Sequence, residues 1–320
     1  MDKSLSTQIP NFFLLGAPKS GTSAMRNYLA SHPNIFFAVP DEPGYFDRKF
    51  RFLHEDDCAY RTLGEYLSLY NGVDPQRHLA VGEGSVYMMY SREILKEILS
   101  LSPTAKFIIM LRNPYLAAIS MHGENLKSYN LGREPKDKFS EAWADLPYRN
   151  VEEIAGIHPM RFRYDLLFSY NKHVEVAREM IGDDNLMFIF YDDFKIDNLG
   201  IAKVVYEFLG VDPNFHPRAS IVNKRSQSRN NLITKMIAWA AKQSRRYRIL
   251  RHLRGRGLAL NRFTQETLEK PKISVELMAD MRKVYQDDIR ALQSTLGKDL
   301  SIWLDTDLTT SLGQDDSEHA

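Results

Sequence analysis

The chain has 320 residues, of which 43% are hydrophobic and 26% are charged, and its formal net charge is +1. This composition is typical of a soluble globular protein that is long enough to bury a large core. The near-neutral charge provides no general field for nucleic acid, so no nucleic-acid partner is expected. Cys58 is the only cysteine, which excludes an intramolecular disulfide, argues against a cysteine-based zinc site and favours a reducing compartment.

The sequence shows no pattern of a signal peptide or of a membrane-spanning segment. Residues 1–10 lack the basic-then-apolar layout of a signal peptide. No apolar run approaches the ~18–20 residues that a membrane span needs. The expected location is therefore cytoplasmic, and no transmembrane segment is expected.

A glycine-containing turn follows the apolar run Asn11–Leu15, and Thr22 begins a helical pattern that continues to residue 31. A strand, a loop and a helix in this order aim backbone N–H groups and a helix N-terminus at a phosphate. Gly16 and Gly21 have the spacing of a P-loop, but Thr22 stands where a nucleoside-triphosphate P-loop has its lysine. The lysine is inside the loop, at Lys19. We therefore expect a phosphate site that does not bind the β- and γ-phosphates of ATP.

An acidic turn follows the next predicted strand, residues 35–39. The segment Pro40–Asp47 contains two prolines and a glycine, so it is expected to form a rigid turn. A turn directly after a strand places Asp41 and Glu42 where α/β sheets keep their ligands. Taken alone, the same residues fit a solvated acidic turn better than a functional site.

Arg112 ends a continuous apolar run, residues 105–111, of the kind found in central parallel strands. Triphosphatases commonly have an aspartate near this point to support Mg²⁺, whereas an arginine suits a second anionic group directly. The helix predicted at 115–121 carries Ser120 about two turns further on. A capped arginine and a surface serine are the ordinary explanations of the two residues taken singly. Together with the displaced Lys19 they favour a binding site.

The remaining elements continue the alternation of strand and helix as far as Gly210. They are a strand at 79–85, a helix at 92–101, helices at 139–146 and 164–181, a strand at 185–191 and a helix at 199–209. This alternation predicts an α/β fold of three layers, a mostly parallel central sheet with helices on both faces, followed by a helical C-terminal part.

Beyond Gly210 the chain becomes basic and then acidic. A polar loop at 223–230 carries Lys224, Arg225 and Arg229, and helix is expected from about residue 232 into the basic stretch 242–256. That stretch fits a solvated helix face or a surface for an acidic partner or anionic lipid. A last amphipathic helix is predicted at 274–296, with Trp303 docking near its end. Residues 305–320 are expected to be a disordered acidic tail, which leaves a single domain at 1–304.

The segment Ala17–Ser23, with Arg112 at a strand end and Ser120 on the next helix, resembles the sulfotransferases that use 3′-phosphoadenosine 5′-phosphosulfate (PAPS). The resemblance covers nearly all of residues 11–304. It implies that Arg112 and Ser120 bind the 3′-phosphate. It also implies that the 5′-phosphosulfate is held by Lys19, Ser20, Gly21, Thr22 and Ser23. The loop that closes over the donor would supply Lys224, Arg225 and Arg229.

The closest resemblance is to the heparan-sulfate-type and bacterial branch of these enzymes. Asp41–Asp47 is similar to the Glu-x-x-Phe-Phe segment of that branch, which makes Glu42 the implied general base, with Glu83 and His122 as alternatives. Val81–Ser85 matches the branch's Glu-Lys-Thr/Ser segment, except that Gly84 replaces the lysine. This replacement weakens any transfer of glycosaminoglycan specificity to this chain.

The implied activity is transfer of a sulfuryl group from PAPS to a hydroxyl or amine of a carbohydrate, lipid or small natural product, with no metal. By analogy with phosphoryl transfer, Glu42 would accept the acceptor's proton and Lys19 would stabilise charge on the leaving phosphate. One alternative is a P-loop kinase of a nucleoside or small molecule, which would need a Mg²⁺-binding acid and a lysine beside Thr22. The other is a non-catalytic scaffold that keeps the donor pocket. Oligomeric state and the choice between O- and N-sulfation stay open.

Overall fold

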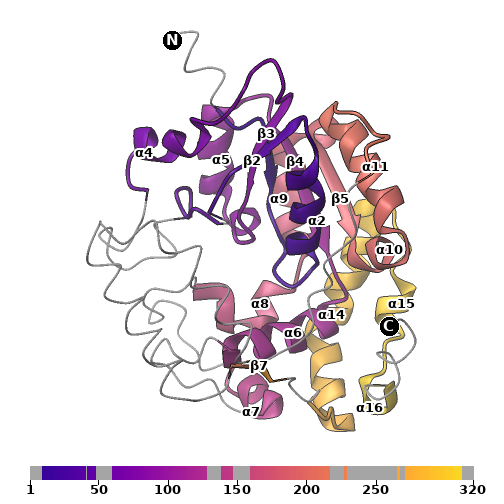
Figure 1. The fold of residues 1–320 in the computed structure, drawn as a ribbon. Helices are drawn as coiled ribbons and strands as arrows, with labels where there is room; N and C mark the ends of the chain where they lie inside the picture. Colours follow the sequence, from indigo (N-terminus) through magenta and orange to yellow (C-terminus); the bar gives the residue numbers. More distant parts are fainter. Residues whose placement is uncertain are drawn as a thin grey trace.

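A computed structural model describes residues 9–40, 42–47, 60–127, 138–146, 159–216, 227–228, 265–266 and 271–311. Its centre is a five-stranded sheet in the order β2-β3-β1-β4-β5 (Figure 1). The strands are β1 (Phe12–Leu14), β2 (Ile35–Phe37), β3 (Ala80–Gly84), β4 (Lys106–Leu111) and β5 (Leu186–Phe190). Every neighbouring pair is parallel, so the carboxyl ends of all five strands meet at one edge. The predicted parallel α/β sheet is confirmed.

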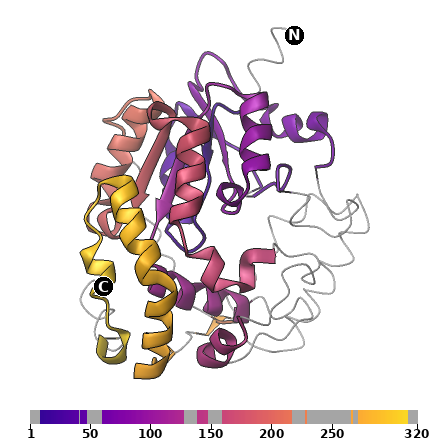
Figure 2. The same cartoon turned by 180° about the vertical axis from the view of Figure 1, so that it is seen from behind.

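Helices cover both faces of the sheet because side chains along each strand alternate between two cores. Phe12 and Leu14 share one core with α2 (Thr22–Ser31) and α11 (Asn198–Leu209). Phe13 and Leu15 lie in the other core. The helices that contribute to it include α5 (Arg92–Leu101), α9 (Asn171–Ile181) and α14 (Val275–Leu296). Figures 1 and 2 show the resulting three layers from opposite sides.

A second group of helices lies beyond the carboxyl edge of the sheet, in the lower half of Figure 1. It contains α6 (Pro114–Lys127), α7 (Phe139–Ala144) and α8 (Tyr164–Leu167). Helix α6 begins three residues after β4 ends, so it is the direct continuation of that strand. The carboxyl edge, where ligands of parallel sheets bind, is therefore faced by helices instead of being open on all sides.

Shorter elements complete the described part of the chain. They are α4 (Leu63–Leu67), η2 (Ser68–Tyr70), η3 (Met88–Tyr90), η7 (Pro159–Phe162), η8 (Asp183–Asn185), α10 (Tyr191–Ile196), β6 (Gln227–Ser228), β7 (Gln265–Glu266), α15 (Ser301–Leu304) and α16 (Leu308–Ser311). None of the described helices combines the length and the apolar character needed to cross a bilayer. The basic stretch 242–256 and the helix expected from about residue 232 lie outside the described residues.

The single helix predicted at 164–181 is wrong, because the chain forms α8 and α9 with a break at Phe168–Tyr170. Asp288 of α14 determines where α9 begins. Its two carboxylate oxygens accept the backbone N–H groups of Tyr170 (2.7 Å) and Asn171 (3.1 Å). Those N–H groups would bond to carbonyls in a continuous helix. A contact from 117 residues away thus overrides a continuous local pattern.

The prediction of a disordered tail from Asp305 onwards is also wrong for residues 305–311. Residues 305–311 are described and include α16, in which Leu308 is 4% exposed. A buried leucine anchors a segment whose remaining residues are mostly polar. Residues 312–320 lie outside the described part, and the buried Trp303 docks as expected.

Candidate functional site

The loop between β1 and α2 is held rigidly against β4. Backbone hydrogen bonds join Leu15 N–H to the Ile108 carbonyl (2.9 Å) and Ala17 N–H to the Met110 carbonyl (2.6 Å). Gly21 then adopts φ +87°, and α2 begins with neither a side-chain cap nor an acidic residue in its first turn. The first N–H groups of such a helix have no partner four residues earlier, and the helix dipole favours an anion beside them.

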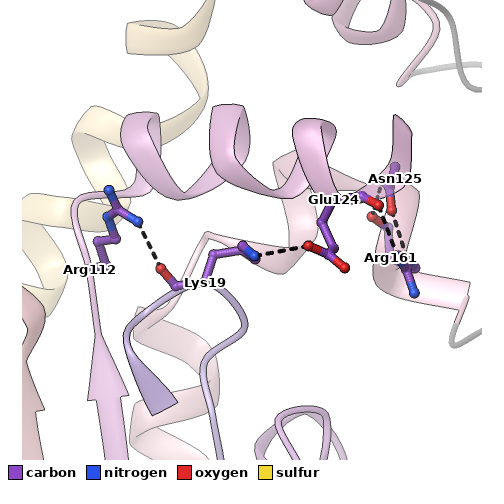
Figure 3. Close-up of polar contacts among 5 residues, drawn as sticks. All are labelled: Lys19, Arg112, Glu124, Asn125 and Arg161. Carbon is purple, nitrogen blue, oxygen red and sulfur yellow. Dashed lines mark hydrogen bonds and ion pairs between the residues drawn. The ribbon is translucent and has the colours of Figure 1, made fainter. Parts of the chain in front are cut away.

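Lys19 lies in this loop with a left-handed backbone, φ +63°. Its carbonyl accepts a hydrogen bond from Nη1 of Arg112 at 3.0 Å. Its ammonium group pairs with Oε2 of Glu124 on α6 at 3.4 Å (Figure 3). The side chains are 28% and 38% exposed, so this ion pair sits at an accessible position. The loop lysine therefore has an internal carboxylate beside it.

Arg112 and Tyr191 form one packed unit with the loop. The Arg112 guanidinium lies over the Tyr191 ring, 4.4 Å from its centroid. The same ring touches the loop so closely that a Cβ added to Gly21 would lie 2.8 Å from Tyr191 Cδ2. Nε of Arg112 is buried and has no hydrogen-bond partner among the described residues. A buried unpaired N–H group is costly, and an anionic oxygen would satisfy it.

Two residues near the loop were not predicted from the sequence. Glu124 escaped notice because the helix expected to end at Met121 continues to Lys127. The signal was available, since Glu124 is four residues after Ser120 and so shares its face of α6. The end of that helix is fixed by Arg161, whose Nε donates to Asn125 Oδ1 at 2.6 Å (Figure 3).

Tyr170 is the second unpredicted residue. Its side chain is 1% exposed, and burial raises the pKa of its hydroxyl, while the neighbouring Ser20 and Arg112 act in the opposite direction. The hydroxyl thus lies under the loop, beside both residues. It was overlooked because residues 164–181 were expected to form one helix, in which Tyr170 would simply have faced the core.

Glu42 follows β2 and reaches the carboxyl edge of the sheet. Its N–H donates to the carbonyl of Gly84 at 3.2 Å, and its own φ is +50°. Among the described residues, the non-glycine residues with positive φ are Lys19 and Glu42. Such conformations cost about 1–3 kcal/mol each and concentrate at functional sites. The two residues expected to be catalytic are therefore the two with this backbone.

The two alternative bases are buried. Glu83 is 1% exposed and accepts a hydrogen bond from the Tyr70 hydroxyl at 3.2 Å. Burial raises the pKa of Glu83 to about 7. Hydrogen bonds from Tyr66 and Tyr70 lower this pKa, and the nearby charge of Asp47 raises it. His122 is 3% exposed, with Nδ1 3.2 Å from the Tyr164 hydroxyl. Neither side chain is open to an acceptor, so the geometry favours Glu42.

Two glycines shape the same edge. A Cβ at Gly84 would meet Phe37 Cζ at 3.2 Å, so little room exists for the lysine that this position has in the heparan-sulfate-type pattern. A Cβ at Gly16, whose φ is +129°, would lie 2.5 Å from the carbonyl oxygen of Val86. The loop and the segment after β3 therefore meet backbone to backbone.

The structure brings most of the predicted donor residues to one edge. Ser20 is fully buried, Thr22 is 8% exposed, Ser23 is exposed and Ser120 is half-buried on α6. The remaining predicted contacts, Lys224, Arg225 and Arg229, lie outside the described residues. Strand β6, from the same loop, pairs antiparallel with β7.

Known proteins resemble this chain along most of its length. A family model described as a sulfotransferase domain matches residues 10–293. Heparan sulfate glucosamine 3-O-sulfotransferase 3B1 of Mus musculus is 25% identical over 208 residues, which are 64% of this chain and 47% of that protein. Heparan sulfate glucosamine 3-O-sulfotransferase 6 of Homo sapiens is 32% identical over 120 residues, covering 37% of this chain and 31% of that protein.

The chain thus spans about half the length of the first of these curated relatives, 47%. A crystal structure of a sulfotransferase from Alicyclobacillus acidocaldarius matches with a TM-score of 0.68 and 23% identity. The match covers 92% of this chain and 98% of that one, so the two share their fold. Since the family model covers most of the residues around the loop, the sheet and α6, the chain belongs to the sulfotransferase domain family.

Proposed function

We propose that this protein transfers a sulfuryl group from PAPS to a hydroxyl or amine of an acceptor. The observation that carries the proposal is a pair of anion positions on one rigid unit. One is the uncapped start of α2 beside Lys19, and the other is the buried, unpaired Nε of Arg112. PAPS has anionic groups at both its 5′ and 3′ positions, which is what two such positions would bind.

The donor is held by backbone groups as much as by side chains. The N–H groups at the start of α2, Lys19 and the Thr22 hydroxyl would bind the 5′-phosphosulfate, while Arg112 and Ser120 would bind the 3′-phosphate. The unsatisfied Arg112 Nε fits this assignment because a phosphate oxygen supplies the acceptor that the described residues do not. Lys224, Arg225 and Arg229 stay part of the proposal as further donor contacts.

The proposed catalytic roles of Glu42 and Lys19 follow from the charges of their side chains. Glu42 would accept the acceptor's proton while the new bond to sulfur forms. Lys19 would stabilise the charge that grows on the donor's bridging oxygen as its bond to sulfur breaks. Because Glu124 pairs with Lys19, that carboxylate would compete with the phosphosulfate for the ammonium group. Positioning and electrostatics supply most of the rate in a loose transition state of this kind.

For the acceptor we favour a carbohydrate, lipid or small natural product of low negative charge. The support is local: Gly84 offers no cation, and Glu42 and Glu124 add partly exposed carboxylates near the edge of the sheet. The curated relatives are named for heparan sulfate, a polyanion. Like-charge groups in a partly buried site disfavour such a chain.

Binding and turnover test the proposal in two steps. Thermal-shift titration should show stabilisation by adenosine 3′,5′-bisphosphate (PAP) and little by ATP with Mg²⁺. Stabilisation by ATP with Mg²⁺ alone would instead support the kinase. The second step offers sulfur-labelled PAPS and a panel of glycosides, lipids and phenols. A protein that binds PAP yet labels none of them under any condition would be the non-catalytic scaffold.

The cytoplasmic location is a separate part of the proposal. It is supported by the single cysteine, Cys58, which excludes an intramolecular disulfide within this chain. Fractionation of cells that express the native gene tests it. Recovery of the protein outside the cytoplasmic fraction would contradict it.

A further inference from the structure

The segment after α14 returns to the carboxyl edge of the sheet and continues past Asp305, where the disordered tail was expected to begin. Leu300 is 1% exposed, Trp303 2% and Leu308 4%. Three buried apolar side chains within nine residues anchor this segment, which would otherwise be too polar to pack. We call residues 298–306 the C-terminal tie.

The tie contacts the residues on both sides of Tyr191. Nε1 of Trp303 donates to Oδ2 of Asp192 at 2.7 Å. Nζ of Lys298 donates to Oδ2 of Asp193 at 2.8 Å and lies 5.1 Å from the centroid of the Phe190 ring. The backbone of Tyr191 is thereby held at both ends while its ring supports the Arg112 guanidinium.

The tie also contacts the residue that follows Arg112. Nδ2 of Asn113 donates to Oγ1 of Thr306 at 2.7 Å. Oδ1 of the same side chain caps α6 by accepting the N–H groups of Tyr115 (3.1 Å) and Leu116 (3.4 Å). Asn113 is 4% exposed and Thr306 is half-buried, so the joint between β4 and α6 is fixed by a partly buried hydrogen bond to a distant part of the chain.

Thr306 is itself held in place. Its hydroxyl donates to the carbonyl of Ile302 at 2.9 Å, and its carbonyl accepts Nη2 of Arg282 at 3.2 Å. The hydroxyl therefore has a fixed direction when it accepts from Asn113. A rigid acceptor of this kind can set the orientation of the residues to which it bonds.

We infer that the C-terminal tie positions the 3′-phosphate site, with Thr306 and Trp303 as positioning residues. It holds Asn113 on one side of Arg112 and Asp192 beside the ring on which Arg112 rests, so it fixes where the guanidinium points. An arginine fork recognises phosphate only in a narrow range of orientations. The tie thus determines how strongly the protein prefers a nucleotide with a 3′-phosphate. This inference rests on the proposed use of PAPS.

The test compares PAP with adenosine 5′-phosphate, which lacks the 3′-phosphate, by calorimetry at one ionic strength. Thr306→Val removes the hydroxyl and keeps the shape of the side chain. It should weaken PAP binding about five- to tenfold and leave adenosine 5′-phosphate within about twofold, because the partly buried hydrogen bond that orients Asn113 is lost. Trp303→Phe should act in the same direction, and Thr306→Ser should restore the preference.

Thr309→Val is the matched control, since that hydroxyl donates to Oδ1 of Asp307, the residue before α16, and not to Asn113 or Asp192. If Thr306→Val and Trp303→Phe weaken both nucleotides equally, or neither, the tie has a structural role only and the inference is wrong. Should Thr306→Val fail to fold, Trp303→Phe alone decides between the two outcomes. A wild-type protein without any preference for PAP would instead overturn the proposed function.

Discussion

The donor side and the base side of the candidate site handle charge in opposite ways. On the donor side, the start of α2 has no acidic residue, Arg112 has an unpaired N–H group, and Lys19 and Glu124 are partly exposed. On the base side, Glu83 and Asp47 are each 1% exposed, with Tyr66 and Tyr70 fully buried beside them. One side is ready to receive an anion, and the other keeps carboxylates in a dry aromatic surrounding.

This difference explains why the two sides need different kinds of support. Anion binding is provided by backbone N–H groups and cations, and a buried N–H group such as Nε of Arg112 needs an acceptor. Buried carboxylates must instead be paired or protonated, because desolvation penalises their charged form. Glu42 is intermediate in burial between the two sides. Its N–H donates to the carbonyl of Gly84, the residue after Glu83.

The largest effect on turnover is expected for substitution of Glu42, the proposed general base. Glu42→Gln should lower kcat by about 10²–10⁴, because it removes the proton acceptor. PAP affinity should stay within about twofold, since the donor side is untouched. Single-turnover transfer with labelled PAPS measures the first quantity and calorimetry the second. Exposed Glu207→Gln on α11 is the control, and near-normal turnover of Glu42→Gln would remove Glu42 from the mechanism.

Lys19→Met tests the donor side in the same assay. Loss of the cation that stabilises the leaving group should lower kcat by about 10²–10³. The exposed Lys203→Met on α11 should have no effect. If Lys19→Met changed only the KM for PAPS, Lys19 would be a binding residue and not a catalytic one.

Glu83→Gln tests whether the base side stores a proton. The pKa of Glu83 is raised from 4.5 to about 7, chiefly by burial. Its contribution to stability is therefore complete below pH 4.5 and is lost as pH rises through 7, by about 3 kcal/mol at most. Glutamine does not titrate, so denaturant unfolding of the variant should lack this fall. Equal pH slopes for both proteins between pH 5 and pH 8 would contradict the buried proton.

The smallest effect is expected for PAP affinity when the ion pair between Lys19 and Glu124 is removed. Glu124→Gln should tighten PAP binding about two- to fivefold at low salt, and the gain should shrink as salt rises, because a partly exposed pair contributes little and is screened. Glu141→Gln, which removes the exposed pair with Lys138, is the matched control. Unchanged affinity at all salt concentrations would mean that Glu124 does not compete with the donor.

Local patterns predicted much of the fold. The helices at 22–31 and 92–101 have the bounds expected from their apolar spacing and flanking residues. The four strands expected after the first were also found, each within about two residues, because continuous apolar runs between turns specify buried strands well. The order of strand, loop and helix around Gly16, Lys19 and Gly21 was also found as expected.

The misses share a physical cause, which is contact between distant segments. Asp288 begins α9 where no local signal does, and Thr306 and Trp303 bind residues more than 100 positions away. Tyr170 and Tyr191 gain their positions from packing against the loop. A sequence pattern specifies which residues face a core but not which partner a polar side chain finds across it.

Gly16 sets the spacing between the two sides of the site. With the Val86 carbonyl only 2.5 Å from the place of a Cβ, any side chain at this position would move the loop away from the segment after β3. Lys19 and Glu42 would then move apart together with the backbones that carry them. A substitution at residue 16 would therefore change the distance between Lys19 and Glu42 without altering either functional group.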